Sequence, residues 1–217
     1  MRFKPHYYFS QGGEMYFIGL TFHQNFVQFK KIDSFRKRFD PYYPLCKSLQ
    51  MTILPPFELS SPRDEKVVVD ALEEELDSFF HGQNIPFKVN FNELDIISGP
   101  KKLICLGSSI PCDIGFAQET IADILNHYEV KFKRKGKSFY ESFLPIGRSL
   151  DNGQLQLAIE QAQEEFTFPM SLYISSITLF QKCPKYWPVV KRLHHFTSDI
   201  YEVRPDELIL AKEGAHC

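Results

Sequence analysis

Several features that define common protein classes are missing from this 217-residue sequence. Its five cysteines are scattered and never form a C-x-x-C pair, which argues against a disulfide framework or a zinc ribbon. No stretch approaches the roughly 20 apolar residues of a membrane span, and the N-terminus lacks the apolar core of a secretory signal. Positive charge is not in excess, since the formal net charge is −2. A secreted, membrane-embedded or dedicated polyanion-binding protein is therefore not expected.

The common catalytic and cofactor motifs are missing as well. The sequence contains no G-x-x-x-x-G-K-[ST], G-x-G-x-x-G, G-x-S-x-G or H-E-x-x-H pattern. Its seven histidines show no metal-ligand spacing beyond the doublet His194-His195, and adjacent residues of a strand face opposite ways. We expect no metal site, no nucleotide cofactor and no flavin.

The composition is that of a globular protein with a substantial core. Hydrophobic residues make up 43% of the chain and charged residues 24%. We expect a loose leader over residues 1–14, a single two-lobed domain over residues 15–200 and a peripheral tail over residues 201–217. The odd number of unpaired cysteines suggests reduced thiols in the cytoplasm, and we expect a monomer.

Hydrophobic periodicity predicts four helices and about eight strands. Ser61 is a candidate N-cap with Pro62 at the first helical position, and Asp151-x-x-Gln154 is a capping-box pattern. In the helix expected near residues 25–39, the basic residues, Arg36 among them, are expected off the apolar stripe. The predicted helices cover residues 25–39, 61–82, 114–128 and a stretch from 151. The predicted strands cover residues 15–22, 47–53 (stopped by Pro55-Pro56), 87–97, 103–106, 143–147, 166–173, 176–181 and 189–196.

Two short segments carry a family resemblance. Leu49-Gln-Met-Thr-Ile-Leu-Pro-Pro-Phe57 resembles a signature of the form P-H-x-T-L-x-x-P-F, and Ser142-Phe-Leu-Pro-Ile-Gly-Arg148 resembles P-H-x-T-[IL]-[AG]-R. Both belong to the 2H phosphoesterases, the superfamily that includes the bacterial 2′-5′ RNA ligase-like and cyclic phosphodiesterase-like proteins. The resemblance spans about residues 15–200 and implies an α+β fold in which two mainly antiparallel sheets face each other across a groove, with helices outside.

The resemblance also implies which positions would carry the chemistry. In such a signature the histidine and the hydroxyl residue share one face of a strand, because residues i and i+2 project the same way. One histidine of the family takes a proton from the attacking hydroxyl, the other protonates the leaving oxygen, and the Thr or Ser hydroxyls hold the phosphate. The histidine positions match Gln50 and Phe143, and the hydroxyl positions match Thr52 and Pro145.

The matching residues predict a protein that has lost the family's catalysis. Gln50 can form hydrogen bonds but cannot exchange a proton at neutral pH, and Phe143 can do neither. Pro145 has no hydroxyl. We therefore predict no catalytic residue, and a groove that holds RNA, a nucleotide or a phosphate through Gln50, Thr52, Phe143, Pro145 and Arg148.

Several alternatives remain open from the sequence. Gln50-x-Thr52 could be an ordinary polar strand face, and a rival alignment places the second signature at residues 176–179, with Ser176 and Thr178. The protein could be an active phosphodiesterase or ligase that uses other residues, such as His23 or a cysteine. It could also be a protein-interaction scaffold that keeps only the fold. Residues 131–137, which hold five basic side chains, fit either an RNA-tracking rim or a solvated loop.

Overall fold

The protein has an α+β fold of four helices and seven strands within the residues that the computed structural model describes, namely 14–59, 61–82, 87–99, 102–109, 111–132, 142–183 and 187–196. Every strand pair is antiparallel. The elements in chain order are β1 (Glu14–Phe22), α1 (Val27–Phe39), β2 (Met51–Leu59), α2 (Pro62–Phe79), β3 (Lys88–Ile97), β4 (Lys102–Ser109), α3 (Cys112–His127), β5 (Ser142–Leu150), α4 (Asn152–Glu165), β6 (Met170–Gln181) and β7 (Val189–His195).

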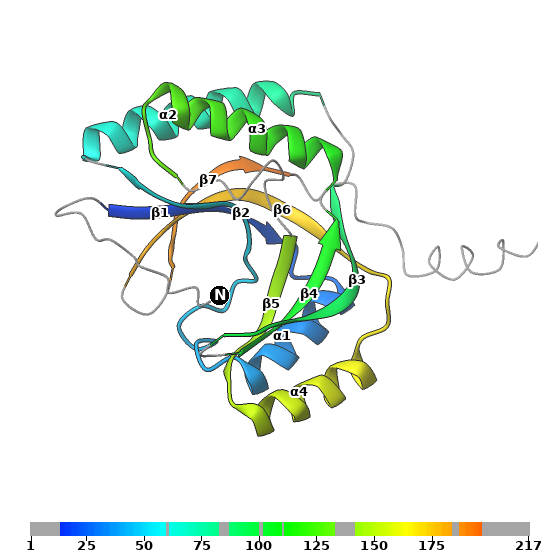
Figure 1. The fold of residues 1–217 in the computed structure, drawn as a ribbon. Coiled ribbons are helices and arrows are strands. Elements are labelled where there is room, and N and C mark those ends of the chain that lie inside the picture. Colours follow the sequence, from blue (N-terminus) through cyan, green and yellow to red (C-terminus); the bar gives the residue numbers. More distant parts are fainter. Residues whose placement is uncertain are drawn as a thin grey trace, which may run out of the picture.

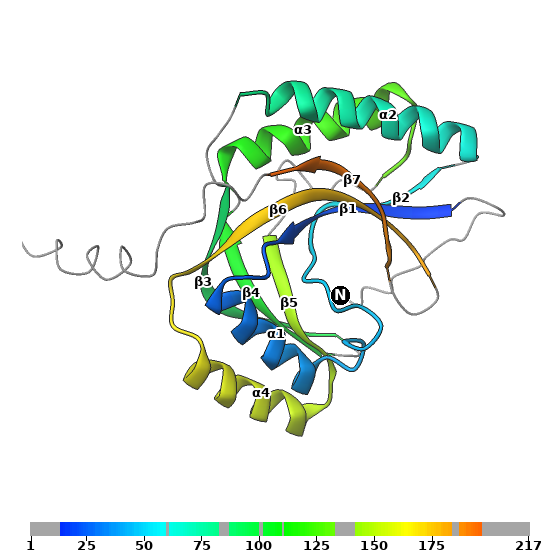
Figure 2. The ribbon, with the colours of Figure 1, turned by 180° about the vertical axis from the view of Figure 1, so that it is seen from behind.

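The long strand β6 joins the two halves of the sheet. The strand order is β2-β1-β6-β3-β4-β5, and β7 also pairs with β6. Residues 170–173 of β6 pair with β3, whereas residues 174–181 pair with β1 and, in part, with β7. Figures 1 and 2 show the β3–β5 half turned steeply away from the half that contains β1 and β2. This bend brings β2 and β5, the two ends of the strand order, into contact with each other.

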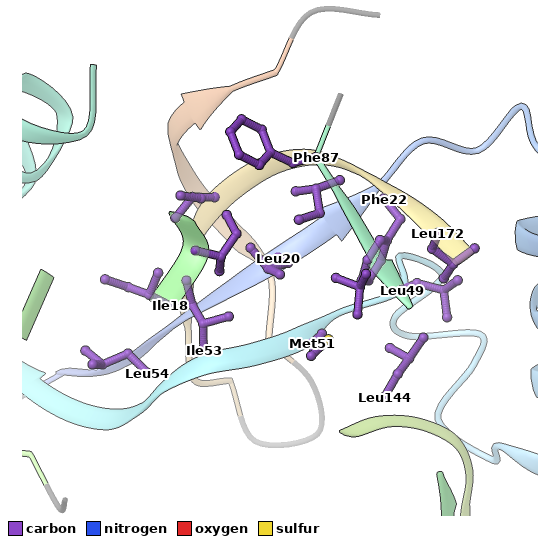
Figure 3. Packing of buried hydrophobic residues seen from close by; sticks show 14 of the residues in the cluster. Ile18, Leu20, Phe22, Leu49, Met51, Ile53, Leu54, Phe87, Leu144 and Leu172 are labelled. Carbon is purple, nitrogen blue, oxygen red and sulfur yellow. The ribbon is translucent and has the colours of Figure 1, made fainter. Parts of the chain in front are cut away.

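The helices cover the two halves from outside. In Figure 1, α2 and α3 lie over the half formed by β1, β2, β6 and β7, while α1 and α4 lie near β4 and β5. One hydrophobic cluster runs through both halves, and its residues Met51 on β2 and Leu144 on β5 are fully buried. Figure 3 shows the side chains of this cluster around β1, β2 and β6. None of the helices within the described ranges combines the length and apolar character needed to cross a membrane.

Local sequence signals placed the helices correctly. Ser61 caps α2, since its side chain accepts a hydrogen bond from the Asp64 N–H, and Pro62 occupies the first helical position. Asp151 and Gln154 form the expected capping box at α4, with both reciprocal hydrogen bonds present. The two motifs are short-range and satisfy helix N–H groups that would otherwise lack partners, which is why the sequence alone reveals them.

Two strand predictions were wrong. The strand expected over residues 47–53 begins at Met51 and runs through Pro55 and Pro56 to Leu59. Prolines are tolerated there because β2 lies at one end of the strand order, where only Phe57 among the described residues pairs along its outer edge, and because its register with β1 shifts near these residues. Residues 170–173 and 176–181 of two expected strands lie in the single strand β6, whereas residues 166–169 of the first lie before it.

Parts of the predicted organisation lie outside the described residues. The expected tail over residues 201–217 lies there entirely, and so does the expected leader except for Glu14, which begins β1. Of the basic segment 131–137, only Lys131 and Phe132 are described, and Phe132 forms an isolated β-bridge with Phe57.

Candidate functional site

The face of β1, β2 and β6 that turns away from α2 and α3 carries a group of hydroxyl and aromatic side chains. Alternation along each strand separates these residues from core neighbours such as Ile18 and Met51. The register places Thr52 and Thr178 opposite Gly19, from either side. The residues of this face are Phe17, Gly19 and Thr21 of β1, Thr52 of β2, and Ser176, Thr178 and Phe180 of β6.

Gln50 directly precedes β2 and is half-buried, as is Thr52 two residues later. The Gln50 side chain donates from Nε2 to Ser48 Oγ at 3.1 Å and to the Trp187 carbonyl at 3.3 Å. Both contacts use the amide as a hydrogen-bond donor, which is the one chemical capacity it shares with a protonated imidazole. Gln50 is thus held in place and has no proton to exchange.

Phe143 and Pro145 lie on β5, where they alternate with the buried Leu144 and Ile146. They stand opposite Gly107 and Cys105 of β4. Both are half-buried, and neither has a titratable group. β5 lies at the other end of the strand order from β2, so Pro145 is tolerated for the same reason as the prolines of β2.

Arg148 is held by a carboxylate from the end of α1. Its Nε lies 3.6 Å from Asp40 Oδ2, and its side chain keeps 29% of its exposure whereas that of Asp40 keeps 1%. The same Asp40 oxygen lies 3.4 Å from Arg36 Nη2. One carboxylate therefore serves two guanidinium groups, and the three side chains together carry one unit of positive charge.

Arg36 is the residue whose placement the sequence analysis got wrong. It is buried in α1 instead of lying off the apolar stripe. Its guanidinium donates to the carbonyls of Cys46, Lys47 and Ser48 at 2.8, 3.1 and 3.3 Å, which fixes the segment before Gln50. The signal was available, because position 36 follows Ile32 by four residues and therefore lies on the buried stripe.

The rival signature positions, Ser176 and Thr178, form part of a chain of hydroxyl groups. Thr21 Oγ1 lies 2.8 Å from Ser175 Oγ and 2.6 Å from Ser176 Oγ, and Ser176 Oγ lies 2.8 Å from Thr178 Oγ1. Ser176 and Thr178 are fully buried. The Thr21 hydroxyl joins β1 to β6 through Ser175 and Ser176, which stabilises this register of the two strands.

Two histidines flank that hydroxyl chain. His195 of β7 is paired with Ser176, and His23 follows the last residue of β1. The pKa of His23 is lowered, first by burial and then by the positive charge of a protonated His195. The imidazole of His23 is therefore harder to protonate than a free histidine.

Acidification should destabilise the fold in part through His23. Because His23 binds its proton less readily in the folded state, the free energy of unfolding should fall as the pH drops from about 6.5 toward the lowered pKa. His23→Asn should remove this part of the pH dependence. Urea denaturation at a series of pH values between neutrality and pH 5 measures it, with the exposed His81→Asn as the control. An unchanged slope in His23→Asn would contradict the prediction.

An aromatic cluster lies beside Gln50. The rings of Phe17 and Phe180 stack at 4.7 Å, and Trp187 meets Phe17 edge-on at 4.9 Å. A Cβ at Gly19 would lie 2.9 Å from the Met51 carbonyl and 3.1 Å from the Phe17 ring, so this position requires glycine. Since the Trp187 carbonyl accepts the hydrogen bond from Gln50, the cluster and the candidate site are directly connected.

Cys105, on the strand next to β5, does not offer a reactive thiol. Cys105 is buried opposite Pro145, and burial, assisted by the nearby Asp95, raises its pKa to about 12. A thiol of this kind is not a nucleophile at neutral pH. All four cysteines of the described ranges are free, and no group of three or more His, Cys, Asp or Glu residues within these ranges could hold a metal ion.

Comparison with known proteins connects this arrangement to solved structures. No protein-family model and no curated protein sequence matches the chain. The crystal structure of E. coli LigT complexed with 3′-AMP is similar at a TM-score of 0.51 and 10% identity, covering 83% of this chain and 97% of that one. A crystal structure described as a phosphoesterase is similar at 0.50 and 14% identity, covering 83% and 97%.

The chain thus has a 2H phosphoesterase-like fold, as the two signatures predicted. At identities of 10% and 14% the likeness is one of fold.

Proposed function

We propose that the protein is a catalytically degenerate relative of the 2H phosphoesterases that binds a nucleotide, an RNA end or another phosphate ester. The observation that carries this proposal is the contact between β2 and β5, which are the strands that bear the two degenerate signatures. In a fold of this kind the two signatures act together, so strands that meet can still present a shared site to one ligand.

The proposed loss of catalysis follows from the side chains at the two histidine positions. General acid–base catalysis contributes typically ~10²–10⁴-fold for each positioned group. Gln50 and Phe143 supply neither a base nor an acid, so both contributions are missing at these positions. Binding makes smaller demands, because it needs donors for the phosphate oxygens and no proton transfer.

The proposed phosphate contacts are the Gln50 amide, the Thr52 hydroxyl and the Arg148 guanidinium. Arg148 is the strongest candidate, since a hydrogen bond from a guanidinium to a phosphate oxygen is charge-assisted. Its contact with Asp40 is through Nε, and its side chain keeps 29% of its exposure, so part of this side chain remains accessible to a ligand. Phe143 and Pro145 would then form an apolar wall.

Binding of adenosine 3′-monophosphate tests the proposal, because 3′-AMP is the ligand named for the similar E. coli structure. Calorimetry should show binding by the wild type and affinity about tenfold weaker or worse for Arg148→Gln, the loss expected for one charge-assisted hydrogen bond. The control is Arg38→Gln, which removes an arginine that pairs with Glu165 on the outside of the fold. Hydrolysis of 2′,3′-cyclic AMP should stay at background.

Two outcomes would contradict the proposal. Hydrolysis at enzyme-like rates would show that catalysis is retained, and the absence of any binding would favour a scaffold that keeps only the fold. Crystals soaked in 3′-AMP would locate the ligand directly, with density expected between β2 and β5.

A working phosphoesterase with displaced chemistry is the second candidate, and one observation favours it. His23 and His195 lie near enough to interact electrostatically, beside the hydroxyl chain of Thr21 and Ser176. Two imidazoles and nearby hydroxyls are the groups that this chemistry uses. Cyclic phosphodiesterase activity that is present in the wild type and lost in His195→Gln would favour this candidate over the first.

We further propose that the protein acts in the cytoplasm as a monomer. The support for a reducing compartment is that the four cysteines of the described ranges are free.

A further inference from the structure

A continuous chain of polar contacts joins Gln50 to Arg148 through the end of α1. Gln50 Nε2 donates to Ser48 Oγ at 3.1 Å, and the Ser48 carbonyl accepts from Arg36 Nη1 at 3.3 Å. Arg36 Nη2 lies 3.4 Å from Asp40 Oδ2, and the same oxygen lies 3.6 Å from Arg148 Nε. Two proposed ligand contacts, one beside β2 and one on β5, are therefore linked by three residues from α1 and the segment after it.

Burial differs along this chain of contacts. The side chains of Arg36 and Asp40 keep 2% and 1% of their exposure, whereas Arg148 keeps 29%. Two guanidinium groups share one carboxylate, so one positive charge is left without a carboxylate partner in this trio. The end that reaches solvent is Arg148, and an anion beside it would neutralise that charge in a partly buried setting, where charge pairs are screened less than at the surface.

Arg36, at the buried part of this chain of contacts, controls the position of Gln50. Arg36 holds three consecutive carbonyls, those of residues 46–48, with a planar fork of donors. The polypeptide continues from these residues into β2, and the Ser48 hydroxyl accepts the hydrogen bond from Gln50. A shift of the Arg36 guanidinium would therefore move the backbone that carries Gln50, and through Asp40 it would also move Arg148.

We propose that Arg36 and Asp40 are positioning residues that hold Gln50 and Arg148 against one and the same phosphate group. Neither residue touches the ligand, and both act through the residues that do. This inference rests on the proposed function, since it assumes that Gln50 and Arg148 contact a phosphate.

Calorimetric titration with 3′-AMP tests the inference in two variants. Arg36→Lys keeps the charge, but an ammonium group cannot hold three carbonyls and a carboxylate as a planar fork does. Its affinity should fall about tenfold, the equivalent of one charge-assisted hydrogen bond that loses its geometry. Ser48→Ala removes only the hydroxyl that accepts from Gln50, and its affinity should fall about threefold, as expected for a neutral hydrogen bond. The control is Arg38→Lys on the same helix, where the arginine pairs with Glu165 and does not contact this network. This variant should bind as the wild type does.

A double-mutant cycle separates positioning from a merely structural role. In the wild-type background the effects of Gln50→Ala and Arg148→Gln on affinity should be non-additive, because the two residues share one ligand group and one network. In the Arg36→Lys background the two effects should become additive. A substitution that only lowers stability has no reason to remove this coupling.

The possible failures are distinguishable. If the wild type does not bind 3′-AMP, the proposed function is wrong and the inference falls with it. If the wild type binds, and both Arg36→Lys and Ser48→Ala match Arg38→Lys in affinity and coupling, the inference alone is wrong. Should Arg36→Lys fail to fold, Ser48→Ala decides, since it leaves the buried charges in place.

Discussion

The Gln50→His/Phe143→His double variant is expected to hydrolyse 2′,3′-cyclic nucleotides at least ~10²-fold faster than the wild type, the lower bound for one positioned acid–base group. Both substitutions restore an imidazole at a position where the 2H signature has one. Gln50 directly precedes β2 and Phe143 lies on β5, and these two strands are in contact, so the two rings would approach a common substrate from both. Adding Pro145→Thr should raise the rate further by returning a hydroxyl to β5.

The pH dependence of the restored activity provides an independent check. Two imidazoles that act as base and acid should give a bell-shaped profile of kcat/KM, with limbs set by the two histidines. A matched control introduces the same residue types elsewhere, as Gln156→His on α4 and Phe116→His on α3, both of which are exposed. If the site variant is no faster than this control, positions 50 and 143 do not serve one substrate, and the proposed site is wrong.

Local interactions explain which parts of the fold could be predicted from the sequence. The caps at Ser61 and Asp151 are formed within four residues, and so they can be recognised in a short window. The course of β2 through Pro55 and Pro56 depends on a non-local fact, namely that β2 lies at one end of the strand order. The continuity of β6 likewise depends on β1, β3 and β7, which pair with different parts of it.

In the candidate site, too, the residues in short sequence patterns could be predicted and the contacts between distant segments could not. Gln50 and Phe143 were identified because each lies in a short pattern that resembles a signature, and the contact between their strands follows from the fold. Asp40 could not be predicted from the sequence as the partner of Arg148. The two residues are more than 100 positions apart, and Asp40 resembles any acidic residue after a helix. Networks that join distant segments require coordinates.

Asp40→Asn is expected to lower the free energy of unfolding by about 3–5 kcal/mol, the typical cost of removing one partner from a buried ion pair. Asparagine has nearly the same shape and can still accept the hydrogen bond that the Tyr42 N–H donates to Asp40 Oδ1 at 3.0 Å. What disappears is the negative charge between two guanidinium groups. Arg36 cannot reach water to compensate, because its side chain keeps only 2% of its exposure.

Burial is the reason for the size of this effect, and a second pair with the same spacing shows it. Lys66 and Asp70 are also an i, i+4 pair, but both side chains are largely exposed. Exposed pairs contribute little, so Asp70→Asn should leave the urea midpoint unchanged within error. Urea denaturation of the two variants compares the same change of charge in two environments. If Asp40→Asn were as harmless as Asp70→Asn, the carboxylate would not hold the two arginines together, and the positioning role proposed for it would lose its physical basis.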